Sequence, residues 1–392
     1  MIKAFKVRLK PNNKQKTKMF QYAGCARFAY NWALTREKEN INLGCRFIRN
    51  EELRREFTQL KKNPEMQWIS SISNNVPKQA IKDACDNYEK YLKGEIESVK
   101  FKTKKYSTPS FFQDPCKIKF TETHVKIEKI ADSRKKNRQQ INWIRLCEKG
   151  RIPLNCNYMN PRFTFDGLYW YVSVSVDIDE STEIPSNKGV GIDLGVINLA
   201  VCSDGHIYKS INKTHKVKKL EKRVNRIRKS ISRKYIKNKK GEKYHKSENI
   251  KKAENKILSI NKKLKGLREN YICQTINNII ERKPSFICIE DLDVKGIMRR
   301  RGLTKAVQKQ NLSEFRHNII YKAKENNVAI IVADRFFPSS KRCIKCGNIK
   351  KDLTLSDRIY VCNRCGNIID RDYQASLNLM WYGEKAMRTL TV

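Results

Sequence analysis

Four cysteines near the carboxyl end have the spacing of a structural zinc site. Cys343 and Cys346 form one Cys-x-x-Cys pair, Cys362 and Cys365 form a second, and 15 residues separate the two pairs. Thiolates at this spacing fit the tetrahedral coordination of zinc. A glycine follows each pair, where a tight turn lets backbone N–H groups face the sulfurs. We therefore predict one structural Zn²⁺ ion bound by these thiols.

Three acidic residues lie where a charge is costly. Asp193 interrupts an apolar run between two glycines, Glu290 closes a second apolar run, and Asp372 begins the last helical pattern. Buried carboxylates need positive charge nearby. Two Mg²⁺ ions, or Mn²⁺, about 3.5–4 Å apart would supply it and would stabilise the attacking and leaving oxygens of a phosphodiester. Together with the ribbon of cysteines, the acids predict a metal-dependent nuclease.

Each of these residues also has a plainer interpretation. Asp193 could be a turn residue, and any acid of the run 290–293 could cap a loop. Asp370 could replace Asp372 as the third acid, with the remaining one pairing with Arg371. The cysteines could brace a nucleic-acid-binding surface without any catalysis.

The composition points to a polyanionic partner. The 392 residues carry 83 Lys and Arg against 40 Asp and Glu, a formal charge of +43. Such an excess repels itself unless nucleic acid neutralises it. We find no apolar stretch of transmembrane length and no signal peptide, so we expect no membrane partner. We expect a cytoplasmic protein of a bacterium or archaeon, associated with the nucleoid, whose other cysteines are reduced.

The first half of the chain alternates between strand and helix patterns. Phe5, Val7 and Leu9 alternate with basic residues, which predicts an initial strand. Helical patterns follow, one capped by Asn13 and another starting after a proline. Asp166-Gly167 between two alternating runs predicts a β-hairpin. We expect a small β domain with a helical unit inserted in it.

A strongly basic stretch follows. Residues 213–269 contain 23 Lys or Arg and five Glu, with apolar residues at steps of three and four. The period breaks around residues 238–242, so we predict two long helices in an antiparallel hairpin. Solvation of an exposed coiled coil is the alternative to nucleic-acid contact for these lysines.

The acidic residues fall within a mixed α/β pattern. Three strands begin at residue 190, a fourth ends at Glu290, Ser313 can cap a helix, residues 328–333 form a further strand, and a last helix follows Asp372. The order of these elements is compatible with an RNase H-like sheet carrying the three acids.

Several of these motifs resemble the transposon-encoded TnpB proteins, compact RNA-guided DNA endonucleases related to type V CRISPR effectors. The resemblance covers nearly the whole chain. It is carried by Gly191-Ile192-Asp193-Leu194-Gly195, Ile289-Glu290-Asp291-Leu292, Phe337-Pro338-Ser339-Ser340-Lys341, the paired Cys-x-x-Cys-Gly ribbon, and Asp370 to Asn378.

The resemblance implies an α/β multidomain fold. A RuvC-type nuclease domain, RNase H-like and with an inserted zinc ribbon, would accompany an amino-terminal β-barrel-like wedge domain with an inserted helical recognition unit. The expected bounds are 1–11 and 98–184 for the wedge domain, 12–97 for the helical unit, 185–337 and 367–392 for the nuclease domain with its basic hairpin at 213–270, and 338–366 for the ribbon.

The family's catalytic acids fall on Asp193, Glu290 and Asp372. Gln374 stands where the family has an asparagine, and residues 266–270 depart from the usual Asn-x-Arg-x-Asp form. The resemblance implies guide RNA and target double-stranded DNA as partners, with a monomer bound to RNA. Candidate nucleic-acid contacts are Tyr30, Asn31, Lys100, Lys102, Lys104, Lys105, Lys218, Arg223, Arg226, Ser340 and Lys341. The first six suit an ordinary solvated loop nearly as well.

Three functions are thus to be weighed. The first is cleavage of DNA next to a short adjacent motif, guided by RNA from the transposon end, which would help maintain the transposon. The second is guide-dependent DNA binding without cleavage, as in a repressor, although such proteins typically lose catalytic acids and all three are present here. The third is a role linked to transposase activity, against which we find no separate DNA-end-binding module.

Overall fold

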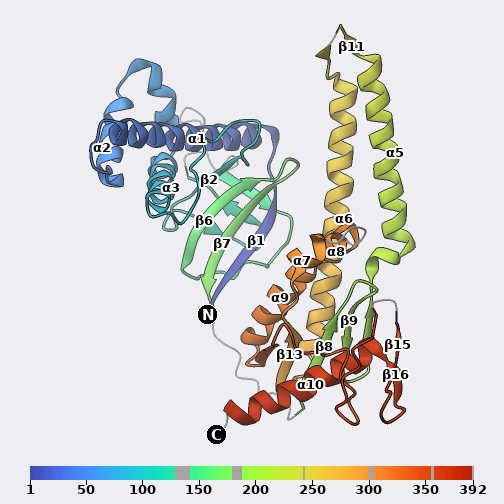
Figure 1. Cartoon of the computed structure of the whole chain (residues 1–392). Helices are drawn as coiled ribbons and strands as arrows, with labels where there is room; N and C mark the ends of the chain where they lie inside the picture. The colour runs from blue at the N-terminus through green and yellow to red at the C-terminus, as the bar shows by residue number, and fades with distance from the viewer. Residues whose placement is uncertain (129–141, 179–187, 242, 300–303, 355–356, 391–392) are drawn as a thin grey trace. The chain divides into compact units, whose positions relative to one another are not determined.

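The structure is a computed structural model that describes residues 1–128, 142–178, 188–241, 243–299, 304–354 and 357–390. The chain divides into two compact units, residues 1–179 and 180–392 (Figure 1). None of the helices within these ranges has an 18-residue stretch apolar enough to cross a bilayer.

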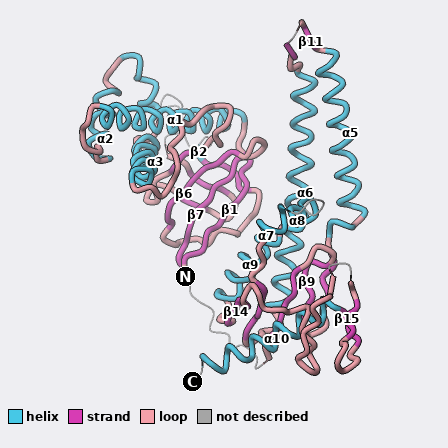
Figure 2. The backbone as a smooth tube through the Cα atoms, viewed as in Figure 1, coloured by secondary structure: helices cyan, strands magenta, loops and turns pink. Residues whose placement is uncertain are grey.

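A seven-stranded antiparallel sheet forms the base of the first unit (Figure 2). Its strand order is β2-β6-β7-β1-β5-β4-β3. The initial strand β1 lies in the middle of the sheet, between β7 and β5. The strands are β1 (Ile2–Lys10), β2 (Ser110–Phe112), β3 (Lys119–Phe120), β4 (His124–Lys126), β5 (Trp143–Leu146), β6 (Tyr158–Phe165) and β7 (Trp170–Asp177).

The hairpin predicted at Asp166-Gly167 is confirmed. Strands β6 and β7 pair antiparallel up to Phe165 and Trp170, which lie opposite each other. Between them, the Asp166 N–H donates to the Tyr169 carbonyl at 3.1 Å. Gly167 has a φ of +94°, a conformation that residues with a Cβ rarely adopt.

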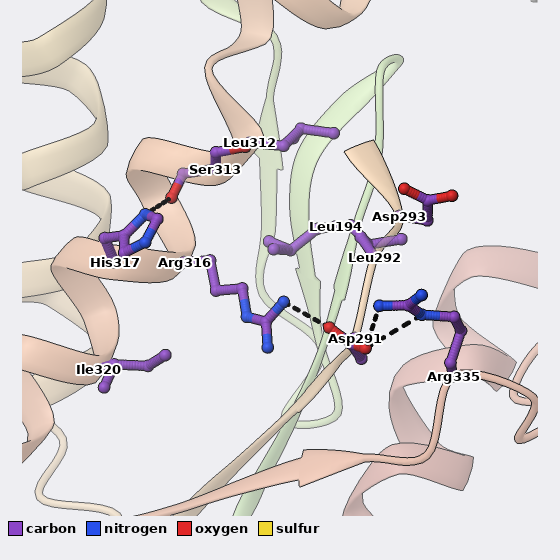
Figure 3. A pocket seen from close by; sticks show the side chains of 10 residues that line it. All are labelled: Leu194, Asp291, Leu292, Asp293, Leu312, Ser313, Arg316, His317, Ile320 and Arg335. Atoms are coloured by element: carbon purple, nitrogen blue, oxygen red, sulfur yellow. Dashed lines mark hydrogen bonds and ion pairs between the residues drawn. The ribbon is translucent and has the colours of Figure 1, made fainter. Parts of the chain in front are cut away.

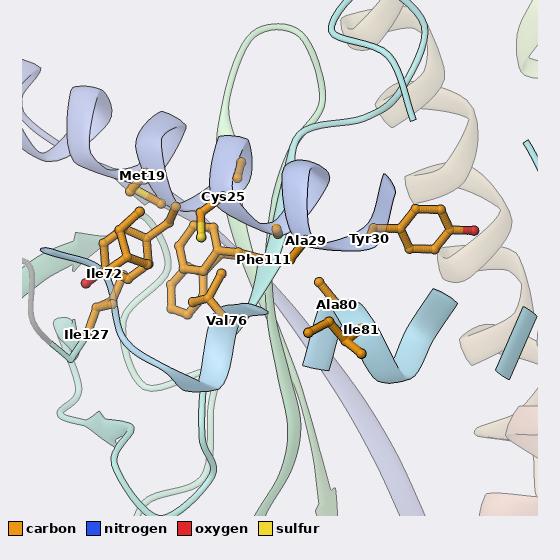
Figure 4. Packing of buried hydrophobic residues seen from close by; sticks show 14 of the residues in the cluster. Met19, Cys25, Ala29, Tyr30, Ile72, Val76, Ala80, Ile81, Phe111 and Ile127 are labelled. Atoms are coloured by element: carbon orange, nitrogen blue, oxygen red, sulfur yellow. The ribbon is translucent and has the colours of Figure 1, made fainter. Parts of the chain in front are cut away.

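The helices of the first unit pack on this sheet through one continuous apolar core. They are α1 (Asn13–Asn42), α2 (Asn50–Leu60), the 3₁₀ helix η1 (Pro64–Ser71) and α3 (Asn75–Leu92). Met19, Cys25 and Ala29 of α1 face Val76 and Ala80 of α3 in the interior (Figure 4). The predicted cap of α1 is wrong by one residue, because Asn12 and Gln15 form the capping box in place of Asn13.

The second unit is built on a five-stranded mixed sheet in the order β10-β9-β8-β13-β14. Strand β8 pairs antiparallel with β9 and parallel with β13, and β13 pairs parallel with β14. The strands are β8 (Val190–Leu194), β9 (Asn198–Cys202), β10 (Ile207–Lys209), β13 (Phe286–Glu290) and β14 (Ala329–Ala333).

Helices cover both faces of this sheet. On one face, Ile192 and Ile289 pack in a core that includes Phe315 and Ile319 of α9 (Leu312–Glu325) and residues of α6 (Glu248–Ile280). On the other face, Phe286 and Cys288 pack with Leu379 of α10 (Arg371–Leu390). Because strand side chains alternate, successive residues of β8 and β13 contact different helices.

The predicted helical hairpin consists of α5 (His215–Lys237) and α6. The two helices lie side by side and are joined by the short strands β11 (Lys239–Lys240) and β12 (Lys243–Tyr244) (Figure 1). Val217, Val224, Ile260 and Leu264 form the buried part of the seam. Helix α6 continues beyond the predicted end of the hairpin, because its carboxyl-terminal part packs on the sheet.

The remaining elements differ from the predictions in detail. Helix α9 begins at Leu312 with Asn311, not Ser313, as its cap residue. Helices α7 (Val294–Arg299) and α8 (Thr304–Gln310) were not predicted, because these residues lack apolar periodicity. Strand β16 (Ile368–Asp370) pairs with β15 (Ile359–Val361), so the small sheet next to the cysteines extends past residue 366.

Candidate functional site

Two of the predicted acids lie at the same edge of the second unit's sheet. Ile192 of β8 lies opposite Ile289 of the parallel strand β13, and Asp193 and Glu290 are the next residues along these strands. Gly191 and Cys288 both face α10. Because side chains two residues apart share a face, Asp193 and Glu290 face α10 as well.

Helix α10 brings the third acid to this edge. A Cβ on Gly191 would lie 2.1 Å from the carbonyl oxygen of Ser376, so only glycine allows the helix to approach β8 this closely. Asp372 lies in the first turn of α10, one turn before Ser376, and is partly buried. Asp370 is exposed and caps the helix by accepting the Tyr373 N–H at 2.9 Å.

We call Asp193, Glu290 and Asp372 the carboxylate set. Burial, followed by the negative charges of Glu290 and Asp372, raises the pKa of Asp193 well above its ordinary value. Arg371 acts in the opposite direction, and Asp370 adds a smaller repulsion. Burial and the neighbouring acids therefore disfavour ionisation of Asp193 more than Arg371 favours it, and Arg358 lies 4.0 Å from Asp372.

This donor set suits a hard divalent cation. Carboxylate oxygens are the ligands that Mg²⁺ and Mn²⁺ prefer, and a cation would relieve the repulsion that raises the pKa of Asp193. Within the described residues, the four cysteines are the set of possible ligands whose atoms all lie within 4.8 Å of one another. The oxygens of the carboxylate set do not converge to this degree.

The four predicted zinc ligands converge. The sulfurs of Cys343 and Cys365 lie 3.6 Å apart, and those of Cys346 and Cys362 lie 3.5 Å apart. A backbone hydrogen bond from the Cys365 N–H lowers the pKa of Cys362 to about 6, against the opposing effect of burial. Four sulfurs, one already favoured as a thiolate, fit a tetrahedral zinc ion.

Glycines and one aromatic ring shape this cysteine site. Gly347 and Gly366, which follow the two pairs, have φ values of +73° and +67°. The backbone N–H groups of these glycines donate to the carbonyls of Cys343 and Cys362, at 2.9 and 3.0 Å, which closes each turn. Tyr360 is fully buried against the cysteines.

Comparisons with known proteins agree with this arrangement. Three family models match the chain: "Helix-turn-helix domain" of OrfB_IS605 over residues 1–44, "Probable transposase" of OrfB_IS605 over 172–301, and "Cas12f1-like, TNB domain" over 313–379. InsQ of Escherichia coli (strain K12), named as a candidate RNA-guided DNA endonuclease, is 23% identical over 98% of this chain and 93% of its own length. A Streptomyces pristinaespiralis protein named in the same way is 26% identical over 97% of this chain and 89% of its own.

These matches show that the chain is similar to the TnpB (OrfB) proteins along nearly its whole length. The fold agrees: a cryo-EM structure of a Cas12f1–sgRNA–target DNA complex contains a protein with a TM-score of 0.56 to this chain, at 14% identity, covering 97% of this chain and 98% of that one. At this identity the match concerns the fold alone.

In this protein, the acids that follow Glu290 have other partners. Asp291 accepts hydrogen bonds from Arg316 at 2.5 Å and from two nitrogens of Arg335 at 2.7 and 3.1 Å (Figure 3). Asp293 accepts the Gly296 N–H at 3.0 Å and so caps α7. Both acids line a cavity of about 450 Å³ on the α9 face of the sheet, away from the carboxylate set.

Two residues next to the carboxylate set were not among the predicted site residues. The Ser339 hydroxyl donates a hydrogen bond to Glu290. The guanidinium of Arg371 donates to the carbonyls of Thr354 and Asp357 at 3.2 and 3.3 Å, in the segment between the two cysteine pairs, and its charge acts on Asp193 and Glu290. The position of Arg371 between Asp370 and Asp372 could have identified it from the sequence as a site residue. Ser339 lies in a polar segment, and nothing in the sequence distinguishes it from the other serines.

Tyr30 and Asn31, predicted to contact nucleic acid, hold a loop of the first unit. Tyr30 is only 3% exposed, and the Lys102 ammonium lies 3.7 Å from its ring centroid. Asn31 exchanges two hydrogen bonds of 2.8 Å with the Lys102 backbone. In this structure both side chains fix the loop that carries the exposed lysines 100, 104 and 105.

The other candidate contacts lie on the second unit. Lys218, Arg223 and Arg226 are exposed on α5, on the side away from its seam. Ser340 and Lys341 lie just before the first zinc ligand and are partly buried, and the Lys341 ammonium donates to the Lys351 carbonyl at 3.3 Å. Their contacts with nucleic acid remain predictions.

Proposed function

We propose that this TnpB-like protein is an RNA-guided, magnesium-dependent DNA endonuclease. It binds guide RNA derived from the transposon and cuts target DNA next to a short adjacent motif, which supports maintenance of the transposon. The observation that carries the proposal is geometric: Asp193 and Glu290 follow paired residues of the parallel strands β8 and β13, and α10, with Asp372 in its first turn, packs closely against β8 at Gly191. Burial and the neighbouring acids also raise the pKa of Asp193. The names of relatives that align along almost the whole chain support it further.

The second unit is the nuclease domain of this proposal. A sheet in which β8 and β9 are antiparallel, while β13 and β14 run parallel to β8, supports an RNase H-like fold of the RuvC type. The finer assignment of the first unit rests on its antiparallel sheet and attached helices. We assign residues 1–11 and 98–184 to a wedge domain and 12–97 to a helical recognition unit.

The carboxylate set would hold the metal ions. Bound to these oxygens, Mg²⁺ supplies a Lewis acid for phosphodiester hydrolysis. Asp193, Glu290 and Asp372 offer the anionic ligands from three separate elements, and Arg371 places a fixed positive charge beside them. Attack of water on phosphorus breaks the bond to the 3′-oxygen, so the products carry a 3′-hydroxyl and a 5′-phosphate.

The remaining surfaces serve the nucleic acids. The exposed basic side of α5 and α6 suits the phosphates of a guide RNA. The loop at 100–105 and the polar residues before Cys343 suit contacts with the DNA strands. The zinc ribbon at 338–366 braces the strand that enters the site. The RNA–DNA pairing then selects the sequence, while the protein contributes shape and charge.

Purification of the full-length protein with its RNA tests this function. Sequencing of the bound RNA identifies the guide, and a plasmid library carrying the matching target with a randomised flank is then exposed to the complex and Mg²⁺. We expect cuts in the targeted plasmids with one enriched flank, and none with Asp193→Ala, which keeps its RNA. Binding of the target without cuts by the unaltered protein would favour a guide-dependent repressor.

A further inference from the structure

The segment from Pro338 to Arg342 leads from the sheet to the first zinc ligand and is fastened to α10. Asn378 of α10 is fully buried, and its amide nitrogen donates to the carbonyls of Ser339 and Arg342 at 2.7 and 2.6 Å. Its amide oxygen accepts from the Arg342 guanidinium at 3.2 Å. One side chain thus holds both the middle and the end of the segment.

A second contact anchors the same segment one turn further along α10. The Arg342 guanidinium lies 3.8 Å from the centroid of the Trp381 ring, and the Lys385 ammonium lies 4.1 Å from the same centroid. Cation–π contacts of this kind favour one orientation of the guanidinium. Arg342 is therefore fixed by both Asn378 and Trp381.

Ser339 connects this fastened segment to the carboxylate set. Its side chain is 5% exposed, and its hydroxyl donates to Glu290. Its backbone is held by Asn378 and by a hydrogen bond from its own N–H to the Phe337 carbonyl at 2.8 Å. Because the backbone is fixed, the hydroxyl has little freedom to leave Glu290.

The zinc loop begins directly after this segment. The Cys343 N–H donates to the Asn348 carbonyl at 2.8 Å, within the turn that carries the first pair of thiols. A continuous path of contacts therefore runs from the zinc ligands through Arg342, Asn378 and Ser339 to Glu290.

We propose that Ser339 is a positioning residue that orients Glu290 for metal binding, and that Asn378 and Arg342 connect this orientation to the zinc ribbon. The proposal rests on the proposed function for the role of Glu290. Hydrogen bonds that orient a ligand carboxylate are worth about 10- to 100-fold in metal affinity. Ser313, an exposed serine of α9 on the opposite face of the sheet from Glu290, provides a matched control.

The test measures metal binding directly. Full-length, zinc-loaded protein with its RNA is titrated with Mn²⁺, and free Mn²⁺ is followed by electron paramagnetic resonance, with Asp193→Ala defining the background binding. We expect Ser339→Ala to raise the half-saturating Mn²⁺ concentration about tenfold, with one zinc per chain retained. Ser313→Ala should bind Mn²⁺ as the unaltered protein does. Cleavage by Ser339→Ala should need correspondingly more Mg²⁺ and approach the normal rate at saturation.

A double substitution tests the connection to the ribbon. Asn378→Ala should also weaken Mn²⁺ binding. The double variant Ser339→Ala/Asn378→Ala should have the same Mn²⁺ affinity as the single variant that binds Mn²⁺ less tightly, because both substitutions act on one path. Additive effects would overturn the connection. If Asn378→Ala does not fold, Arg342→Gln takes its place in the experiment, because Arg342 is partly exposed and its substitution should disturb folding less.

The possible outcomes distinguish a failure of this proposal from a failure of the proposed nuclease function. Normal Mn²⁺ binding by Ser339→Ala, with weakened binding by Asp193→Ala, would overturn the role of Ser339 and leave the nuclease site standing. Equal Mn²⁺ binding by Asp193→Ala and the unaltered protein would overturn both.

Discussion

The pKa values of partly buried carboxylates shift in opposite directions in the two units of this protein. In the first unit, Asp83 receives two hydrogen bonds from Arg162 at 2.8 and 3.0 Å and one from Gln79 at 2.9 Å. Burial opposes its ionisation, but these donors outweigh burial and lower the pKa of Asp83. In the second unit, burial and neighbouring acids raise the pKa of Asp193.

A second pair of acids shows the same difference. Glu128 in the first unit accepts from Ser73 at 2.7 Å and from Lys117 at 2.8 Å. Burial raises the pKa of Glu290 in the second unit, against its bond from Ser339 and the charge of Arg371. An acid with its own cation stabilises a fold, whereas the carboxylate set retains a demand for positive charge, because the pKa of Asp193 stays raised although Arg371 lies beside it and Arg358 lies 4.0 Å from Asp372. That demand distinguishes a candidate metal site from a structural ion pair.

The largest effect should come from Asp193→Asn, which keeps the shape of the side chain and removes its charge. We expect cleavage of guided target DNA to fall by about 10³-fold or more, because a metal ligand is lost. Guide RNA binding should be unchanged. The melting temperature of the metal-free protein at pH 8 should not fall, because the raised pKa of Asp193 means that its charge opposes folding there. Single-turnover cleavage and calorimetry measure the two results. Retained cleavage would remove Asp193 from the site.

The next largest effect should come from the four cysteines that we predict to bind zinc. Cys362→Ser leaves three thiols, and we expect a loss on the order of 4 kcal/mol in the stability of the second unit, because metal binding contributes directly to folding. Zinc content and thermal unfolding measure the result. Cys116→Ser, at an exposed cysteine outside the site, is the control. An unchanged melting temperature of Cys362→Ser, or after chelation, would contradict a structural zinc ion.

The zinc ligands show what sequence spacing can establish. Coordination fixes the distance between thiols within each pair, so the pattern of residues 343–365 alone predicts the convergence that the structure has. The helical hairpin and the Asp166 turn were similarly predictable, because periodicity and turn chemistry are local. The cap of α1 was also encoded locally, in the spacing of Asn12 and Gln15, and was misread by one residue.

Contacts between distant segments were not predictable in this way. An acid within an apolar strand stands out in the sequence, so Asp193 and Glu290 could be selected. Neither the parallel pairing of β8 with β13 nor the close approach of α10 at Gly191 has a local signature. Ser339 lies 49 residues from Glu290 in sequence, and only the fold brings the two together. The order of strands in both sheets depends on such contacts as well.

An Asp-to-Asn substitution in the first unit, at Asp83, tests the contrast with Asp193. Asp83→Asn leaves Arg162 without its ionised partner, and we expect a loss of about 3 kcal/mol in the stability of the first unit. Cleavage per folded molecule should be retained, in contrast with Asp193→Asn. Asp86→Asn, at an exposed position of the same helix, should change neither quantity. Denaturant unfolding and active-site titration distinguish the outcomes, and unchanged stability of Asp83→Asn would contradict a structural role for the pair.

The smallest effect should concern Glu37, the exception within the first unit. It is fully buried, accepts the Ile48 N–H at 3.3 Å, and has a pKa raised by burial to about 7. The folded state therefore holds a proton that the unfolded state releases near pH 4.5. The resulting stability is fully present below pH 4.5 and is lost as the pH rises through 7, a change of about 2 kcal/mol between pH 5 and 8.

Glu37→Gln should remove this pH dependence, because a neutral amide keeps the shape of the protonated acid. The variant should match the unaltered protein near pH 5 and exceed its stability at pH 8, as measured by urea unfolding across this range. Glu51→Gln, at an exposed acid of α2, should leave the pH dependence in place. A variant equally stabilised at both pH values would mean that Glu37 is ionised in the folded state, like Asp83. In that case Glu37 would not be an exception, and it would join Asp83 among the acids of the first unit that are ionised in the folded state.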